Sequence, residues 1–317
     1  MTFPAQHAGA PDDVDHVLLT RFNLPSVGAE SYIRAAEGWL RERVELFERF
    51  CLPSVQNQTM TDRLAWLVYL DPESPAWLKA RVSEWAGRSP MTPIYRAEVP
   101  RQALVADLRR VSGGDGRMLV TTNLDNDDGL AADFSARVRV AVGTGLDTGP
   151  SAVYVDRGLI LGNARTYLRR DTVNAFCSVA ESWDDPVTCW SAWHNELGRL
   201  MPEIHVDGPP GWLQVIHGRN VSNRVRGRLT SPAVHSDRFP GLIDDLDDPS
   251  AWTRLQELLL EPARQVREVM RRAVKRVLLA MGGPAALERV HALRNGLRHR
   301  AAAQLHEPET GQRPPQT

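Results

Sequence analysis

The chain has 317 residues, of which 42% are hydrophobic and 24% are charged, and its formal net charge at pH 7 is −1. These values are ordinary for a globular protein, and a net charge so close to zero excludes a strong general attraction to nucleic acid or to an anionic membrane. No apolar run approaches the roughly 20 residues of a membrane-spanning helix. The three cysteines lack metal-type spacing and cannot all pair within the chain, so we expect reduced thiols and a cytoplasmic location.

Strands and helices alternate in the first part of the predicted pattern. Short buried apolar runs predict strands over 16–20, 64–70, 94–96 and 118–124. Apolar residues at helical spacing predict helices over 38–50, 76–86 and 100–111. We expect Pro53 to end the first helix or to start the next turn. This alternation indicates an α/β fold with a mixed, mostly parallel sheet flanked by helices, in which ligands bind beyond the carboxyl ends of the strands.

The most informative segment is Asp125-Asn126-Asp127-Asp128, the acidic run, directly after the fourth predicted strand. Three carboxylates so close together repel one another and raise each other's pKa. A divalent cation that prefers oxygen ligands, Mg²⁺ or Mn²⁺, relieves this repulsion, and such a cation typically carries substrate phosphates as well. We therefore predict a metal-bridged diphosphate site at this edge of the sheet. An EF-hand is excluded because the later ligand positions of that loop are not matched.

The pattern changes beyond residue 141. The run 151–162 predicts two strands joined as a hairpin at 156–158, and 212–216 predicts a strand that ends at His217. Residues 262–281 keep apolar helical spacing on one face and arginines on the other. This helix either packs its apolar stripe on the protein or on a second subunit, which is the usual role of such helices, or makes a peripheral contact with an anionic membrane.

Four segments, in chain order, resemble the nucleotide-binding half of GT-A (Rossmann-like) glycosyltransferases. They are the strand end Thr20-Arg21-Phe22-Asn23, the helix end over 50–59, the strand end Asp71-Pro72-Glu73-Ser74, and the acidic run, which is similar to the DXD motif of that fold. With the late segment over 212–223, the chain resembles the putative rhamnosyltransferase family of bacterial polysaccharide synthesis across about 16–225. It departs from the family pattern at Phe22-Asn23, where Tyr-Asn is usual, and at Pro72-Glu73.

The resemblance implies a set of metal ligands. Asp127 would bind the cation that bridges the donor diphosphate, and Asp125 would contact the ribose or a metal-bound water. Asp128 is a further candidate ligand. A late histidine often completes the shell in this fold, which implies His217 in that role; a hydrogen-bonded structural histidine is the alternative.

Donor-binding residues follow from the same likeness. Asp71 would accept a hydrogen bond from the nucleobase or the ribose, although an Asp-Pro pair is also a common start of a turn. Arg21 would reach the base or the diphosphate, and Thr20 and Asn23 stand beside it at the strand end.

Inverting transfer also requires a base that deprotonates the acceptor hydroxyl. Family members carry a glutamate near the segment 179–186, which implies Glu181, with Asp185 as a second candidate; Asp184 and Asp185 precede Pro186 and also suit a turn. Trp183, Trp190 and Trp193 either line an acceptor pocket or belong to the core.

The resemblance also organises the chain. We predict a disordered N-terminus over 1–15, a GT-A domain over 16–230, a C-terminal helical extension over 231–303 and a disordered tail over 304–317. The GT-A domain would divide into a nucleotide-binding half, 16–140, and an acceptor half, 141–230. No internal repeat is present.

The function implied is metal-dependent transfer of a sugar from a nucleotide-sugar donor, dTDP-rhamnose by family likeness, to a glycan or lipid-linked acceptor with inversion. Two alternatives stay open. A Mg²⁺-dependent nucleotidyltransferase uses similar acidic residues, although no basic glycine-rich phosphate loop is present near the N-terminus. A scaffold of the same fold, without catalysis, would recruit partners through 262–281.

Overall fold

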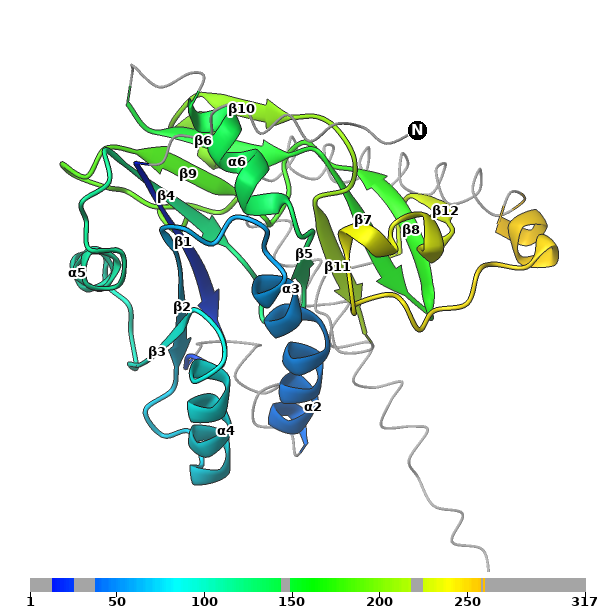
Figure 1. Ribbon diagram of the computed structural model, residues 1–317, viewed down its shortest axis with the longest axis horizontal. Coiled ribbons are helices and arrows are strands. Elements are labelled where there is room, and N and C mark those ends of the chain that lie inside the picture. Colours follow the sequence, from blue (N-terminus) through cyan, green and yellow to red (C-terminus); the bar gives the residue numbers. More distant parts are fainter. Residues whose placement is uncertain (1–12, 26–37, 144–148, 218–224, 258, 260–317) are drawn as a thin grey trace, which may run out of the picture. The chain divides into compact units, whose positions relative to one another are not determined.

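The structure is a computed structural model that describes residues 13–25, 38–143, 149–217, 225–257 and 259 (Figure 1). The chain divides into two compact units, 1–250 and 251–317. Within the second unit, residues 251–257 are helical. The described part of the chain contains no helix that is long and apolar enough to cross a membrane. The helix predicted over 262–281 and the predicted tail lie outside the described residues.

The main sheet of the first unit has seven strands in the order β10-β6-β9-β4-β1-β2-β3. They are β1 (Val14–Arg21), β2 (Leu64–Leu70), β3 (Met91–Tyr95), β4 (Met118–Asn123), β6 (Ser151–Val155), β9 (Ser178–Glu181) and β10 (Glu203–Val206). Only β9, among these seven, runs antiparallel to its neighbours β4 and β6. The predicted mixed, mostly parallel sheet is therefore confirmed.

Helices cover both faces of this sheet (Figure 1). Successive side chains of a strand point to opposite faces, so alternate residues enter different cores. Leu18 and Trp66 pack against the helices α2 (Trp39–Leu46), α3 (Leu52–Gln56), α4 (Ala76–Ala86) and α6 (Phe134–Gly143). Val17 and Leu67 belong to the opposite core, which contains residues of α5 (Arg101–Ser112) and of the segment that follows β9.

A second sheet has the order β12-β8-β7-β11-β5. Its strands are β5 (Gly129–Leu130), β7 (Arg157–Gly162), β8 (Arg165–Arg170), β11 (Trp212–Ile216) and β12 (Arg228–Thr230). Strand β5 follows the acidic run directly, and its Leu130 pairs with Trp212 of β11. Phe239, Leu242 and Ile243 pack with Leu213 of β11, so the first residues of the predicted C-terminal extension contribute to the core of the first unit.

The helix predicted over 38–50 extends past Pro53. Helix α2 continues through a π-helical turn, Phe47–Cys51, into α3, where Pro53 lies in the first turn. Proline is tolerated there because the backbone N–H groups of a first turn need no partner within the helix. Of the two alternatives predicted for Pro53, the end of the helix is therefore wrong, and Pro53 instead lies in a new turn, the first of α3.

The predicted hairpin over 151–162 was also wrong. Strand β6 belongs to the main sheet and β7 to the second sheet, so the chain crosses between sheets at 156–158. The hairpin lies one strand later, where β7 and β8 join across Asn163 and Ala164, whose φ angles of 53° and 55° suit a tight turn. Gly158 is required by packing instead, since a Cβ there would stand 1.9 Å from Cδ2 of Trp212.

His16 is a buried titratable group of β1. Its Nε2 lies 2.8 Å from Oγ1 of Thr122. Burial, together with the charge of Arg139, lowers the pKa of His16 to about 3. In an unfolded chain the pKa is about 6.5. Below that pH the unfolded chain binds more protons than the fold, so His16 makes the protein less stable as the pH falls toward 3.

The variant His16→Gln cannot titrate at this position and tests this linkage. Between pH 7 and pH 5, the natural chain should lose roughly 2 kcal/mol more of its unfolding free energy than the variant does. Urea denaturation of both proteins at the two pH values measures the difference. Equal losses would show that His16 takes up its proton as readily in the fold as in the unfolded chain.

Candidate active site

The carboxyl ends of β2, β1 and β4 lie side by side because these strands are adjacent and parallel. Asp71 follows β2, Asn23 follows β1, and the acidic run follows β4. The backbone N–H of Asp71 donates to Oδ1 of Asn23 (3.1 Å), and Nδ2 of Asn23 donates to Oγ of Ser74 (3.0 Å). The structure thus brings Asn23 and Asp71 to the same edge as the acidic run.

Hydrogen bonds join the acidic run to the end of β1. Nδ2 of Asn126 donates to the carbonyl oxygens of Phe22 and of Arg21, the latter at 3.3 Å. Oγ1 of Thr20 donates to the carbonyl oxygen of Leu124 (2.8 Å) and accepts from Nε1 of Trp66 (2.9 Å). Because Thr20 is buried and its hydroxyl is bonded on both sides, it positions the acidic run, which does not fit the predicted contact with a donor.

Asp127 is buried between the side chains of Arg43 and His217. Its Oδ2 lies 2.6 Å from Nη1 of Arg43 on α2 and 2.9 Å from Nε2 of His217 after β11. Burial alone would raise the pKa of Asp127, but the hydrogen bond from His217 and the charge of Arg43 outweigh it and hold the pKa below its usual value. The structure therefore joins two of the predicted metal ligands, Asp127 and His217.

Asp128 has a different environment. Its side chain is buried, and Oδ1 accepts the backbone N–H of Val215 in β11 at 2.8 Å. Burial and the charges of Asp127 and Asp125 raise the pKa of Asp128 well above its usual value. This carboxyl group joins the acidic run to the second sheet, a position that suits a structural role better than the predicted metal ligation.

Asp125 is the exposed member of the acidic run. The surrounding protein still removes part of its hydration, and this effect and the charge of Asp127 raise the pKa of Asp125 to about 6. Nδ2 of Asn123 lies 3.3 Å from its Oδ1 and favours the charged form. Asp125 therefore offers a carboxylate that a ligand from solution can reach.

Trp190 completes this edge. The Arg21 guanidinium lies 4.1 Å from the centre of the Trp190 ring, and Nε1 of Trp190 donates to Oδ1 of Asn123 (2.8 Å). Trp183 lies elsewhere, because its Nε1 donates to Oδ2 of Asp15 (3.0 Å) near the start of β1. Trp193 is 74% exposed. Of the three tryptophans proposed for an acceptor pocket, Trp190 is the one beside the acidic run.

Glu181 lies at the opposite edge of the sheet. It pairs with Leu119, four residues before Asn123 in β4, or about 13 Å along the strand. Its two carboxylate oxygens accept the backbone N–H groups of Val187 (2.7 Å) and Thr188 (2.8 Å). Burial raises the pKa of Glu181. This placement speaks against Glu181 as the base, because neither oxygen faces the acidic run.

Asp185 lies in the segment that follows Glu181. Its side chain is 86% exposed and forms an ion pair with Arg101 at the start of α5. Its carbonyl oxygen also accepts from Arg101 (3.1 Å). Asp185 thus fixes this segment to α5, and its role as a base stays a prediction.

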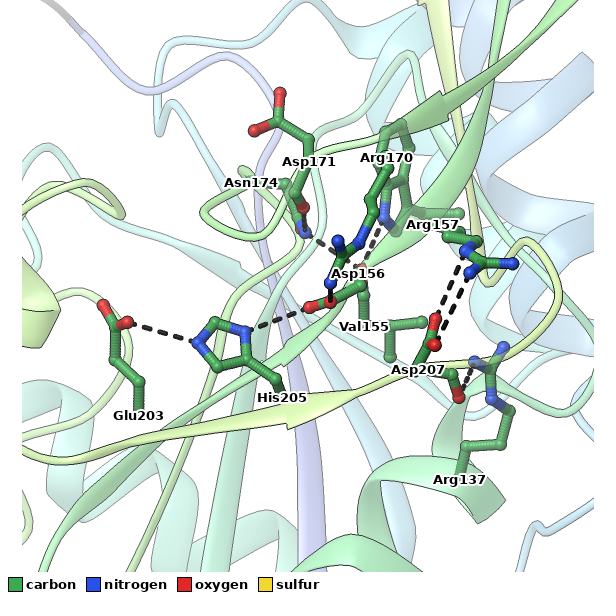
Figure 2. Close-up of polar contacts among 11 residues, drawn as sticks. Arg137, Val155, Asp156, Arg157, Arg170, Asp171, Asn174, Glu203, His205 and Asp207 are labelled. Carbon is green, nitrogen blue, oxygen red and sulfur yellow. Dashed lines mark hydrogen bonds and ion pairs between the residues drawn. The ribbon is translucent and has the colours of Figure 1, made fainter.

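A second polar cluster lies at the ends of β6 and β10, on the same edge of the sheet (Figure 2). The buried Asp156 carboxylate accepts from Nη2 of Arg170 (3.0 Å) and lies 3.0 Å from Nδ1 of His205. Nε2 of His205 lies 3.3 Å from Glu203. Beside this cluster, Arg157 and Asp207 form an ion pair at 3.2 Å. Arg170 and Arg157 each pair with a carboxylate of this group.

Asn174 and Ala175 connect the second cluster to the acidic run. Nδ2 of Asn174 donates to the carbonyl oxygen of Val155 (3.0 Å), directly before Asp156. The carbonyl oxygen of Ala175 accepts from Nδ2 of Asn123 (2.9 Å). The two polar clusters therefore flank the short segment that leads into β9.

Two residues of the site were missed by sequence reasoning. Arg43 belongs to an amphipathic helix about 80 residues before the acidic run, where arginines usually face solvent. Trp190 was considered for an acceptor pocket or for the core, not as the partner of Arg21. Neither role carries a local signal, because Arg43 meets Asp127, and Trp190 meets Asn123, through the folding of distant segments.

The donor chemistry of Asp125, Asp127 and His217 suits a hard divalent cation such as Mn²⁺ or Mg²⁺, which prefers oxygen ligands and accepts an imidazole. In the described part of the chain, no three His, Cys, Asp or Glu side chains are already grouped as metal ligands. The residues therefore fit a cation that is held by one or two carboxylates and completed by substrate oxygens, which is the usual arrangement for Mg²⁺ with phosphates.

Residues 15–229 match the family described as "Putative rhamnosyl transferase". The chain belongs to this family. The match includes nearly all of β1, the acidic run, β11 and His217. A comparison with curated proteins gave no match.

Solved structures with a related arrangement include both glycosyl and nucleotidyl transferases. TarS 1-349 of S. aureus in complex with UDP has a TM-score of 0.36 and 7% identity, over 64% of this chain and 60% of that one. The mannosyltransferase PcManGT of Pyrobaculum calidifontis, in complex with GDP-Man and Mn²⁺, has a TM-score of 0.39 and 15% identity, over 93% and 81%. The inositol-1-phosphate CTP transferase of T. maritima has a TM-score of 0.35 and 8% identity, over 74% and 98%.

This chain spans 60% of the length of the S. aureus protein. At TM-scores this low, the likenesses add nothing to the chemistry of the site, which rests on the family and on the geometry above.

The variant Glu181→Gln separates a structural role from a catalytic one. Glutamine would place an NH₂ group against a backbone N–H that now has an acceptor, so we expect a loss of about 1–3 kcal/mol in unfolding free energy. Sugar transfer by the folded variant should be nearly unchanged. A drop in kcat of a hundredfold or more at unchanged stability, measured by denaturation and by product release, would restore Glu181 as the base.

Proposed function

We propose that the protein transfers a sugar from a nucleoside-diphosphate donor to a glycan or lipid-linked acceptor, with a divalent cation bound at the acidic run and inversion at the sugar. Rhamnose is the sugar suggested by the family, and dTDP is the proposed carrier. The observation that carries the proposal is the meeting of Arg21, Asp71 and the acidic run at one edge of the main sheet, beyond the carboxyl ends of three parallel strands. Open α/β sheets bind ligands at such an edge.

Asp125 and Asp127, with His217, would hold the cation, Mn²⁺ or Mg²⁺. When bound, it neutralises negative charge on the departing nucleoside diphosphate. Asp125 suits first contact with the cation because it is exposed. Asp127 suits binding of the cation because its pKa is held low, so its carboxylate is charged at neutral pH. Asp128 would keep the acidic run in place through its bond to β11.

The donor nucleotide would lie along the ends of β1 and β2. Asp71 would accept a hydrogen bond from the base or the ribose, and Asn23 would fix the turn that presents Asp71. Arg21, held over the ring of Trp190, would face the diphosphate or the base. A guanidinium suits this position because it stays charged and matches phosphate oxygens in geometry.

Two other functions remain as alternatives. A nucleotidyltransferase would release pyrophosphate, whereas sugar transfer releases a nucleoside diphosphate, so product analysis separates the two. A non-catalytic scaffold would bind neither nucleotide nor cation, which calorimetry with nucleotides and Mn²⁺ would show. Peripheral membrane contact through 262–281 and the absence of nucleic-acid partners stay predictions.

The variant Asp127→Asn tests the role of the acidic run. Because the amide cannot supply the negative charge that holds the cation, we expect release of nucleoside diphosphate to fall by roughly 10²–10³-fold. The matched control is Asp115→Asn, an exposed aspartate before β4, which should keep full activity. Full activity of the natural chain in excess chelator would contradict metal dependence.

The variant Asp71→Asn tests the donor site. A contact with the base or ribose is made equally in the ground and transition states, so its loss should raise the KM for the donor by about tenfold with little change in kcat. The alternative is a turn residue only, because Oδ1 of Asp71 accepts the backbone N–H of Glu73 (2.8 Å). In that case the melting temperature falls and the KM stays the same, which thermal denaturation and donor titration distinguish.

A further inference from the structure

Arg43 contacts the acidic run through an ion pair and a hydrogen bond. Its Nη1 lies 2.6 Å from Oδ2 of Asp127 and 3.2 Å from Oδ1 of Asn126. Its guanidinium also lies 5.4 Å from the centre of the Trp39 ring. Only 14% of the Arg43 side chain is exposed. An arginine so deeply placed on a proposed metal ligand requires an explanation.

The contacts at Oδ2 of Asp127 define a competition. A carboxylate oxygen has about two positions for partners, and here Arg43 and His217 occupy both. A cation that binds this oxygen must displace one of them. Arginine keeps its charge at every ordinary pH, so the Arg43 guanidinium always repels a second cation at this oxygen.

We propose that Arg43 and the divalent cation compete for Asp127, and that Arg43 passes to the diphosphate of the donor when the cation binds. This inference rests on the proposed function and names the coupling between its two ligands. The cation alone binds weakly because it must break the Arg43–Asp127 pair. The cation with a nucleoside diphosphate binds well because the released guanidinium gains phosphate oxygens in place of the carboxylate.

The chemistry of the site supports this exchange. A guanidinium recognises carboxylate and phosphate with the same planar pair of N–H groups, so a change of partner costs little geometric fit. Asn126 and the Trp39 ring hold the guanidinium beside the acidic run in either state, and the backbone near Arg21 accepts from the same Asn126. A buried arginine without any anion would be costly, so Arg43 needs a new anion as soon as it leaves Asp127.

The variant Arg43→Met should change the affinities for Mn²⁺ and for dTDP in opposite directions. Arg43→Met keeps the length of the side chain and removes the charge. The affinity for Mn²⁺ alone, measured by electron paramagnetic resonance of the free ion, should rise about tenfold because the competing Arg43 guanidinium is gone. Binding of dTDP in the presence of saturating Mn²⁺, followed by calorimetry, should become about tenfold weaker because the phosphate partner is gone.

The matched control is Arg41→Met, on the same helix, where the arginine is exposed and lies over Trp77. It should change neither affinity. If Arg43→Met does not fold, as judged by circular dichroism and thermal denaturation, Arg43→Lys carries the test. Lysine keeps the charge but not the paired N–H groups, so dTDP should bind several-fold more weakly while the affinity for Mn²⁺ does not fall.

Binding by the natural chain tests the proposed function, and binding by the Arg43 variants tests the exchange of partners by Arg43. Failure of the natural chain to bind Mn²⁺ with dTDP, UDP or GDP would overturn the proposed function and the inference together. Normal binding by the natural chain, with both affinities falling in Arg43→Met or in Arg43→Lys, would overturn the inference alone and leave Arg43 as a structural partner of Asp127. An unchanged Mn²⁺ affinity in Arg43→Met would also overturn it, because the cation would then use the other oxygen.

Discussion

Three carboxyl groups stand where the two sheets of this protein join, and the two buried ones need partners supplied from distant parts of the chain. An uncompensated charge in such a place costs several kcal/mol, so the fold has to satisfy it. Asp128 receives the backbone N–H of Val215, Asp127 receives Arg43 and His217, and Asp125 reaches the surface. The positions of α2 and β11 depend on this requirement.

The same constraint gives the three aspartates different chemistry. Burial raises the pKa of Asp128. The hydrogen bond from His217 and the charge of Arg43 lower the pKa of Asp127, and partial desolvation beside another charge raises the pKa of Asp125 to about 6. Chemically identical groups whose pKa values are made different in this way take separate roles, as in many active sites. One secures the sheet, one holds charge at neutral pH, and one meets solvent.

Much of this arrangement could be predicted from the sequence, because it depends on local patterns. The apolar runs fix the strands β1, β2 and β4, and a parallel sheet brings their carboxyl ends together, so Asn23, Asp71 and the acidic run had to share an edge. His217 was predictable from its place after a strand. Arg43 was not, since a charged residue on an amphipathic helix carries no sign of the partner that it will meet.

The prediction for Glu181 rested on family likeness, whereas the place of Glu181 in the fold depends on the direction of its strand, which the sequence does not show. A run of four residues gives the same pattern whether it lies parallel or antiparallel to its neighbours. Because β9 is antiparallel, its end lies at the edge where β4 begins. The hairpin at 156–158 failed for a related reason, since Gly158 marks close packing on Trp212 and a change of sheet, not a reversal of the chain.

That single antiparallel strand also explains how one edge serves two sets of contacts. The chain enters β9 at the site edge, so Asn174 and Ala175 lie between the acidic run and the Asp156 cluster. It leaves β9 at the far edge and must return along the α5 face, where the N–H of Cys189 donates to Oγ1 of Thr121 (2.9 Å), before Trp190 reaches Asn123. Had β9 been parallel, Glu181 would have ended beside the acidic run and this returning segment would not be needed. The reversal therefore keeps the Glu181 carboxylate away from this acidic edge, and the returning segment brings an aromatic ring that holds Arg21, which lessens repulsion where the proposed diphosphate must bind.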